Sequence, residues 1–342
     1  MRIGMIAPPW LPVPPTGYGG IELVVYGLTE GLVERGHEVV LFAPGDSQTS
    51  AKLVPIVGKH IGQDWPGLAA SIGACFSGYC YARAFLERVD VVHDHTLHHQ
   101  VSFPLPSVHT LHGPRAHGHA RAVQMSAEGR NYFVAISRRQ RELYGEEGIN
   151  WAGVVHNAMD ARNIPFSTRK EGYLLFVGRA NWEKGLDLAV RVAVKARQRL
   201  VMAVKMTEAH EREYFAREVQ PWMAKGDVTL LGEITPQEKL DLYRSASCTV
   251  FSSQWEEPFG LVMTESMACG TPVVALNRGA APEVIVDGVT GFVCADEEEM
   301  VEAVRRAREL DPVACRNHVE KNFSVAKMAA EYEAIYRRVL AS

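Results

Sequence analysis

The order of the first predicted elements restricts the fold of this chain most. Residues 2–7 (RIGMIA) predict a short buried strand, residues 21–35 a helix and residues 38–43 a second strand. A strand, a helix and a strand in this order make a βαβ unit, whose two strands lie parallel in one sheet. The order begins again at residues 173–177, which predict a strand, and continues with a helix that ends near residue 197. The sequence therefore predicts an α/β fold built from doubly wound parallel sheets.

The length of the chain and a polar run near its middle divide it into domains. The chain has 342 residues, which is the length of two domains of ordinary size. Residues 162–172 are irregular, basic and polar, as linkers between domains are. We therefore expect an amino-terminal domain over residues 1–165, a carboxy-terminal domain over residues 166–322 and a last helix within residues 323–342. Residues 51–63 show no clear periodicity and predict an irregular segment.

The composition is that of a globular protein and excludes several classes of partner. The chain is 47% hydrophobic and 22% charged, and its net charge of −4 gives no support to nucleic-acid binding. No apolar run approaches the length of about 18 residues that a transmembrane helix needs. The six cysteines form no C-x-x-C pair. We therefore expect reduced, mainly buried thiols and a cytoplasmic protein without a transmembrane segment.

The loop after the first predicted strand contains three glycines but lacks the spacing of a dinucleotide-binding loop. Gly17, Gly19 and Gly20 are followed by Ile21 and Glu22, so the last glycine of G-x-G-x-x-G is missing. A dehydrogenase is therefore disfavoured.

Residues 255–270 (WEEPFGLVMTESMACG) combine the start of a helix with two acidic residues. Pro258 keeps the chain extended at Glu257, and a helix is expected to begin near Phe259 or Gly260. Glu257 precedes this helix, and Glu265 is expected about two turns into it. The first amides of a helix bind anions, and carboxylates bind hydroxyl groups. Taken singly, Glu257 is an ordinary capping acid and Glu265 a solvated one, but together they suit a ligand that is part phosphate and part sugar.

The sequence E-P-F-G-x-x-x-x-E, followed by M-A-x-G-x-P-V-V-A, resembles the nucleotide-sugar signature of retaining glycosyltransferases with the GT-B architecture. The resemblance is greatest to glycosyltransferase family 4. Further motifs of that family are G-G-x-E at residues 19–22, D-V-V-H-x-H at residues 90–95 and G-R-x-x-x-E-K-G at residues 178–185. The resemblance implies two Rossmann-like domains that face each other across a cleft, with the last helix packed back on the first domain. The short first domain is also similar to that of compact antibiotic-oligosaccharide transferases such as those of avilamycin biosynthesis.

The family motifs imply roles for particular residues of this chain. Arg179 and Lys184 would grip the diphosphate of the donor, Glu265 its ribose and Glu257 the transferred sugar. The donor-binding set implied by the resemblance is Gly20, Arg179, Lys184, Ile234, Glu257, Phe259, Gly260, Leu261 and Glu265. The implied catalytic set is Glu257, His112, Arg179 and Lys184, and the implied acceptor side is Glu22, His93 and His95.

The resemblance implies an enzyme that moves a sugar from a nucleoside-diphosphate sugar to a hydroxyl of a small molecule or glycan, with retention at the anomeric carbon. The chain has no D-x-D motif, and its histidine-rich segments, which include His98 and His99, have no H-E-x-x-H frame. We therefore expect neither a metal nor another cofactor. Residues 205–208 (KMTE) replace a glycine-rich turn that is usual in the family and leave the shape of the nucleotide pocket open. A nucleotide-sugar 2-epimerase of the same fold and a non-catalytic two-domain small-molecule binding protein are the alternatives.

Overall fold

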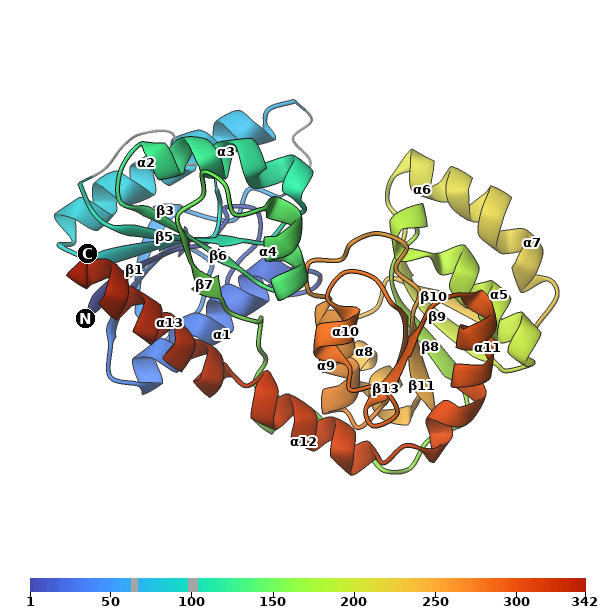
Figure 1. Ribbon diagram of the computed structural model, residues 1–342. Coiled ribbons are helices and arrows are strands. Elements are labelled where there is room, and N and C mark those ends of the chain that lie inside the picture. Colours follow the sequence, from blue (N-terminus) through green and yellow to red (C-terminus); the bar gives the residue numbers. More distant parts are fainter. Residues whose placement is uncertain (63–66, 98–103) are drawn as a thin grey trace. The chain divides into compact units, whose positions relative to one another are not determined.

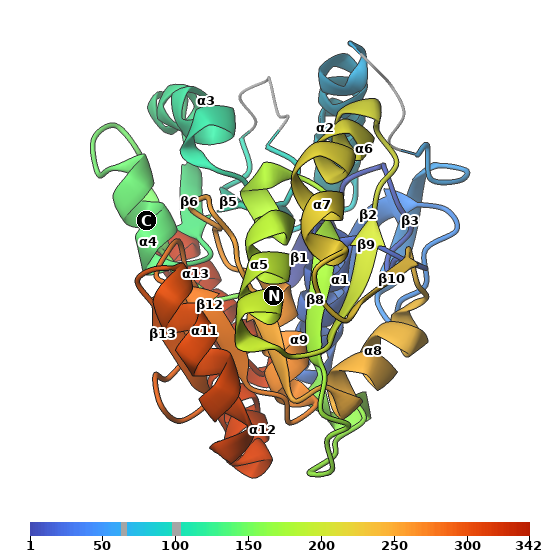
Figure 2. The same cartoon turned by 90° about the vertical axis from the view of Figure 1, so that its right-hand side faces the viewer.

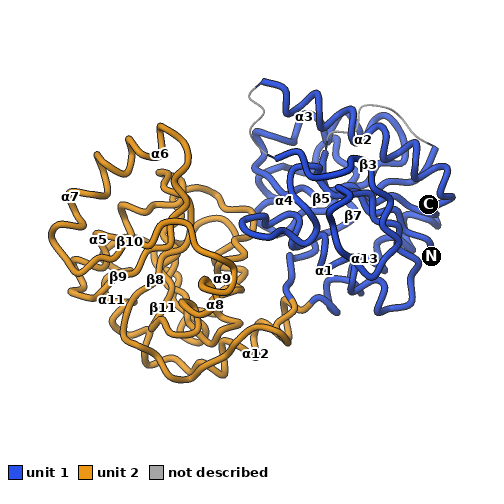
Figure 3. Tube along the Cα trace, turned by 180° about the vertical axis from the view of Figure 1, so that it is seen from behind, with its two compact units in different colours: residues 1–159, 325–342 blue, residues 160–324 orange. Residues whose placement is uncertain are grey.

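The computed structural model describes residues 1–62, 67–97 and 104–342. The chain forms two compact units (Figure 3). Unit 1 contains residues 1–159 and 325–342, and unit 2 contains residues 160–324. The end of the chain therefore belongs to the same unit as its beginning.

Unit 1 is built around a seven-stranded parallel sheet in the order β3-β2-β1-β4-β5-β6-β7. The strands are β1 (Arg2–Ile6), β2 (Glu38–Pro44), β3 (Lys52–Val57), β4 (Val91–Asp94), β5 (Ser107–Leu111), β6 (Asn131–Ala135) and β7 (Trp151–Val154). The central strands are buried on both faces, as strands of a parallel sheet covered by helices are. The strand order reverses between β1 and β4, whose carboxyl ends lie beside each other with Ile6 in register with Asp94.

Five helices cover the sheet of unit 1. They are α1 (Gly20–Glu34), α2 (Ala69–Leu86), α3 (Arg115–Ala127), α4 (Arg138–Tyr144) and α13 (Val325–Ala341) among the described residues. Helices α2 and α3 lie on one face of the sheet, and α1 and α13 lie on the other (Figure 1). Helix α13 packs closely on α1 because Gly31 leaves room for it. A Cβ atom at Gly31 would lie 2.6 Å from Cγ1 of Val325.

Unit 2 contains a six-stranded parallel sheet in the order β10-β9-β8-β11-β12-β13. The strands are β8 (Leu174–Arg179), β9 (Leu200–Lys205), β10 (Val228–Gly232), β11 (Cys248–Phe251), β12 (Val273–Leu276) and β13 (Gly291–Cys294). The strand order reverses between β8 and β11, and in doubly wound folds ligands bind outside the carboxyl ends of the strands at such a point. The two strongest motifs of the sequence, residues 178–185 and 257–265, follow these two strands.

The helices of unit 2 cover both faces of its sheet. They are α5 (Leu186–Ala196), α6 (Ala209–Tyr214), α7 (Gln220–Met223), α8 (Pro236–Ser245), α9 (Leu261–Ala268), α10 (Ala281–Val284), α11 (Glu297–Arg306) and α12 (Pro312–Asn322). Helices α5 and α11 lie side by side and bury Leu186, Val190 and Met300 in the larger apolar core (Figure 2). Tyr243 of α8 and Cys269 after α9 belong to a second apolar cluster.

The sequence-based prediction of a few segments is wrong. Residues 51–63 were expected to be irregular, but β3 (Lys52–Val57) pairs there with β2 as an edge strand, where a proline such as Pro55 is tolerated. Gln63 lies outside the described residues. Helices α3, α6, α7, α10 and α12 have no counterpart among the predicted elements.

The cysteines of both units are unpaired thiols, and five of the six are buried. Burial raises the pKa of Cys248, Cys269, Cys294 and Cys315 to about 12, so these thiols stay protonated and unreactive at neutral pH. None of the helices in residues 1–62, 67–97 and 104–342 has the length and apolar character needed to cross a membrane.

Candidate active site

A tight turn joins the end of β8 to α5 in unit 2. It contains the 3-10 segment Trp182–Lys184 and Gly185, whose φ is +64°. A Cβ atom at Gly185 would lie 2.0 Å from the carbonyl oxygen of Ser252, which follows β11. The Ser252 hydroxyl in turn donates a hydrogen bond to the Gly185 carbonyl oxygen at 2.7 Å. Glycine is therefore required where the loops after β8 and β11 meet.

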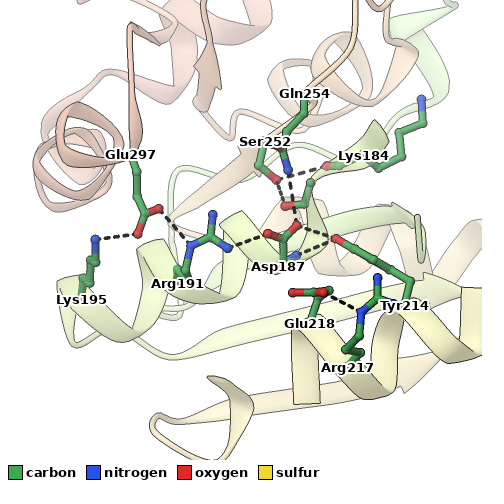
Figure 4. A network of polar contacts seen from close by, with 11 residues as sticks. Lys184, Asp187, Arg191, Lys195, Tyr214, Arg217, Glu218, Ser252, Gln254 and Glu297 are labelled. Atoms are coloured by element: carbon green, nitrogen blue, oxygen red, sulfur yellow. Dashed lines mark hydrogen bonds and ion pairs between the residues drawn. The ribbon is translucent and has the colours of Figure 1, made fainter. Parts of the chain in front are cut away.

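Asp187, in the first turn of α5, connects the β8–α5 turn to neighbouring elements through hydrogen bonds (Figure 4). Its carboxylate accepts hydrogen bonds from the Tyr214 hydroxyl, from Nη1 of Arg191 and from Nε2 of Gln254. Gln254 belongs to the loop after β11, so this network connects the same two loops a second time. Figure 4 shows that the side chain of Lys184 extends away from the network. The backbone of Lys184 is thus fixed while its ammonium group is directed elsewhere.

Lys184, Trp255 and Glu257 form a cluster at the ends of these loops, here called the Lys–Trp–Glu cluster. Nζ of Lys184 forms an ion pair with Oε2 of Glu257. The same oxygen accepts a hydrogen bond from the indole Nε1 of Trp255 at 2.9 Å. The ammonium group also lies 5.1 Å from the centre of the Trp255 ring, which is a cation–π distance. The structure therefore brings together a cation and a carboxylate that the sequence motifs place 73 residues apart.

Helix α9 begins at Leu261, four residues after Glu257, with Gly260 as its N-cap. Gly260 has a φ of +84°, and a Cβ atom there would lie 2.9 Å from the ring of Phe251. Phe259 is buried, and its ring packs against that of Phe323. Within the described part of the chain, no acceptor is found for the backbone amides of Gly260 and Leu261. The start of α9 therefore offers hydrogen-bond donors to an anion.

The loop after β12 fixes the backbone of Glu257 from the other side. A Cβ atom at Gly279 would lie 2.4 Å from both the amide nitrogen and the carbonyl oxygen of Glu257. The amide of Ala280 donates to this carbonyl oxygen at 3.0 Å, and the amide of Gly279 donates to the carboxylate of Glu256 at 3.2 Å. The backbone of Glu257 is therefore held independently of the contacts that its side chain makes.

Glu265 lies about one turn into α9, not two, because the helix begins at Leu261. Its side chain is 7% exposed and forms an ion pair of 2.7 Å with Nζ of Lys239 from α8. This burial excludes the interpretation of Glu265 as a solvated helix carboxylate. Contact with a ribose stays a prediction.

Among the described residues, Arg179 forms ion pairs with two carboxylates at the start of α6 and not with Glu257. Its Nε donates to Oε1 of Glu211 at 2.7 Å, and its Nη2 donates to Oε1 of Glu208 at 2.6 Å. The Glu211 side chain is fully buried and also accepts the amides of Thr207 and Glu208. Burial opposes the ionisation of Glu211, but these amides and Arg179 lower its pKa overall. The segment that departs from the family thus supplies partners for the expected diphosphate ligand Arg179.

The expected base-binding position lies in the loop between β10 and α8. This loop contains Ile234, and the neighbouring Glu233 lies 3.5 Å from Nζ of Lys205 at the end of β9. Carbonyl and amide groups of this loop remain the predicted contact for a base.

In unit 1 the structure brings His95 and His112 together. They follow the neighbouring strands β4 and β5, and Nδ1 of His95 shares a hydrogen bond of 2.8 Å with Nε2 of His112. Burial lowers the pKa of His112 to about 4, and it lowers the pKa of His95 well below its usual range. Both rings are therefore neutral at pH 7, and the shared hydrogen bond holds His112 in one orientation.

His93 is not available to an acceptor, contrary to the expectation from its motif. Its side chain is fully buried in β4. Both ring nitrogens are already occupied, Nδ1 by the Tyr336 hydroxyl and Nε2 by the Thr110 hydroxyl, each at 2.7 Å. Tyr336 belongs to α13, so His93 connects this helix to the sheet of unit 1. The strand pattern D-V-V-H-x-H does not reveal the burial of His93. In a parallel sheet covered by helices, the side chains on both faces of a strand are buried, so the pattern does not mark one face as exposed.

Gly20 and Glu22 lie at the start of α1 in unit 1. Gly20 is the first residue of the helix, but close packing demands glycine one residue earlier, where a Cβ atom at Gly19 would lie 2.7 Å from Cβ of Pro15. Glu22 is buried in the first turn, and burial raises its pKa to about 7. Its carboxyl group is therefore partly protonated at neutral pH.

No group of three or more His, Cys, Asp or Glu side chains is arranged to hold a metal ion in the part of the chain that the structure describes. His98 and His99 lie outside the described residues.

Three contact residues of unit 2 were not predicted from the sequence: Trp255, Lys239 and Glu211. Trp255 stands two residues before Glu257, so a local signal existed. Lys239 is 26 residues from Glu265, and Glu211 is 32 residues from Arg179. No local pattern reports such pairs, because only the fold brings them together.

Comparison with known proteins supports these motifs. Residues 18–163 match the model of Glycosyltransferase Family 4, and residues 160–322 match the model of Glycosyl transferases group 1. The chain is 26% identical to a glycogen synthase of Mycobacterium tuberculosis over 92% of this chain and 88% of that protein. It is 25% identical to a glycosyltransferase involved in avilamycin A biosynthesis, with a TM-score of 0.77 and coverage of 100% of this chain and 98% of that one. The HepE protein of Anabaena, solved in complex with UDP and glucose, has a TM-score of 0.73 at 15% identity, with coverage of 99% and 100%.

The two family models divide the chain as the structure does. The second model begins at residue 160, where unit 2 begins, and the two models together cover residues 18–322. Each unit contains one parallel sheet with a reversal of strand order, as a Rossmann-like domain does. The chain therefore belongs to the GT-B glycosyltransferases, with an amino-terminal half of the family 4 type and a carboxy-terminal half of the group 1 type.

Proposed function

We propose that this glycosyltransferase is a retaining enzyme that uses a nucleoside-diphosphate sugar and needs no metal ion. The observation that carries the proposal is the Lys–Trp–Glu cluster beside the start of α9. A diphosphate requires positive charge and hydrogen-bond donors, which Lys184 and the α9 amides supply. Sugar hydroxyls require acceptors such as the carboxylate of Glu257. The complex of the Anabaena protein with UDP and glucose supports a donor of this class.

Without a donor, Lys184 and Glu257 neutralise each other. A diphosphate carries more negative charge than one carboxylate, so we assign the Lys184 ammonium to the diphosphate when the donor binds. Glu257 then accepts hydrogen bonds from the sugar. When the bond between the anomeric carbon and the phosphate oxygen breaks, positive charge develops on the sugar and negative charge on the leaving diphosphate. Glu257 stabilises the first charge and Lys184 the second.

Retention follows if the acceptor hydroxyl attacks from the face that the diphosphate leaves. In this route a phosphate oxygen takes the proton of the acceptor hydroxyl as the new glycosidic bond forms. The sequence motifs offer no obvious nucleophile beside His112, so we prefer attack within an ion pair over a covalent intermediate.

We assign recognition of the acceptor to unit 1, with Glu22 and His95 as its polar groups, and we keep His112, which His95 orients, as a catalytic residue. The reduced, mostly buried cysteines support a cytoplasmic enzyme.

The test is to incubate the protein with a panel of UDP-, ADP-, GDP- and dTDP-sugars and hydroxyl acceptors in the presence of EDTA. We expect release of nucleoside diphosphate from one donor class and, by NMR, a product with the anomeric configuration of the donor. Inverted product, or activity that EDTA abolishes and one divalent ion restores, would contradict the proposal. A new nucleotide sugar formed without any acceptor would instead identify an epimerase.

A further inference from the structure

One carboxylate oxygen of the Lys–Trp–Glu cluster has two donors while the other has none. Oε2 of Glu257 receives the indole N–H of Trp255 at 2.9 Å and the ammonium group of Lys184. Oε1 of Glu257 has no partner among the residues that the structure describes. The carboxylate is therefore held by one oxygen and presents the other.

We propose that Trp255 is a positioning residue that keeps Glu257 oriented toward the donor sugar during the reaction. The inference rests on the proposed function of Glu257 and extends it to a residue outside the family motif. Lys184 is shared between two anions in the catalytic cycle, because the donor diphosphate competes with Glu257 for it. The indole N–H is not shared in this way. It carries no net charge, so a distant diphosphate does not draw it away from the carboxylate of Glu257.

The second contact of Trp255 adds to this role. The Trp255 ring lies under the Lys184 ammonium, 5.1 Å from ring centre to Nζ, and a cation–π contact constrains where the ammonium can move. When Lys184 turns to the diphosphate, Oε2 of Glu257 keeps the indole hydrogen bond, and its Oε1 stays directed at the sugar. Trp255 thus lets Lys184 bind the diphosphate while Glu257 stays directed at the sugar, and it does so without contacting the donor itself.

This role predicts an effect on turnover that packing alone would not produce. Trp255→Phe keeps an aromatic ring near Lys184 and removes the N–H donor together with the five-membered ring that carries it. A hydrogen bond to a charged group has the strength to lower kcat by roughly 10-fold or more when it is lost. Affinity for the free nucleoside diphosphate, which lacks the sugar, should change by less than about 3-fold.

Trp222→Phe is the matched control. Trp222 also carries an ammonium group over its ring, that of Lys225 at 3.9 Å, but it lies in α7, outside the motifs from which the donor ligands are assigned. This variant should keep the kcat of the wild type. The thermal midpoint of each variant establishes that it is folded.

The experiment measures steady-state donor turnover and calorimetric affinity for the nucleoside diphosphate in Trp255→Phe, Glu257→Gln, the double variant and Trp222→Phe. If Trp255 acts through Glu257, the loss in the double variant is much smaller than the product of the two single losses. Full activity of Trp255→Phe, or losses that multiply, would overturn the inference while leaving the proposed function intact. A wild-type protein that neither binds nor turns over any nucleotide sugar would overturn both.

Discussion

Glu257 is the counterion of Lys184 as well as the proposed sugar ligand, and the two roles have opposite effects on binding. Glu257→Gln removes the charge that neutralises Lys184. We expect the affinity for free nucleoside diphosphate to stay the same or rise, while kcat falls by about 100-fold because charge on the sugar is no longer stabilised. Calorimetry beside steady-state kinetics checks both values. Weaker nucleotide binding with unchanged kcat would contradict this assignment.

Glu265 should behave in the opposite way. If its carboxylate binds the ribose, which does not change during the reaction, Glu265→Ala weakens free nucleotide and donor equally and leaves kcat nearly unchanged. The loss of a charged hydrogen bond predicts roughly 10- to 150-fold weaker binding. Glu302→Ala, which removes an exposed carboxylate of α11, is the matched control. Loss of turnover without loss of affinity in Glu265→Ala would mean that the donor lies along α9 differently.

At the residue scale, the sequence indicates candidate ligands but not the side chains that contact them. Glu257 and Lys184 stand in motifs whose residue types and spacing indicate their chemistry. The acidic partners of Arg179 could not be predicted, because Glu208 and Glu211 reach it from another element. His93 shows the reverse error, since its motif is right but its side chain points into the interior.

At the scale of elements, the start of α6 is the feature most specific to this chain. Glu208 is half exposed and competes with a diphosphate for Arg179, whereas Glu211 is buried and forms part of the fold. We expect Glu208→Gln to strengthen the binding of nucleoside diphosphate by up to about 5-fold, the range of an exposed ion pair. Glu213→Gln is the control, because Glu213 lies on the same helix and faces Arg217. Weaker binding in Glu208→Gln would show that Glu208 supports the site.

The elements of the two sheets were predictable where an apolar run lies between clear turns. Strands were predicted at residues 2–7, 38–43 and 173–177, and β1, β2 and β8 begin and end within two residues of these bounds. Strand β3 was missed because an edge strand buries only part of one face and carries a proline. Helix α3 was missed because few of its residues are buried, so its apolar stripe is narrow.

At the scale of the molecule, four buried histidines make the stability depend on pH. Burial lowers the pKa of His93, His95, His109 and His112, although Asp94 acts against this at His109. The unfolded chain therefore takes up protons near pH 6.5, before the folded chain does. The contribution of the four histidines to the free energy of unfolding is complete above about pH 6.5 and declines toward pH 4. For His112 alone, the loss at pH 5 is roughly 2 kcal/mol.

Glu22 opposes this trend and provides the control. The pKa of Glu22 is about 7 in the folded state, and the ordinary pKa of a glutamate is near 4.5. Between these two pH values the folded chain binds a proton at Glu22 that the unfolded chain does not bind. Protonation of Glu22 therefore raises the free energy of unfolding as the pH falls. This gain offsets the loss that about one of the four histidines causes. We expect scanning calorimetry to give a lower melting temperature at pH 5 than at pH 7.5, with a larger difference in Glu22→Gln. A wild-type melting temperature that does not change between these pH values would contradict the account.

The central claim is that Lys184 in unit 2 recognises the diphosphate of the donor. The most direct measurement is the calorimetric affinity of the wild type and of Lys184→Met for the nucleoside diphosphate and for the corresponding nucleoside, with Lys225→Met as the matched control. We predict that Lys184→Met binds the diphosphate about 10- to 150-fold more weakly and binds the nucleoside as the wild type does. Equal affinity of Lys184→Met and the wild type for the nucleoside diphosphate would contradict the claim.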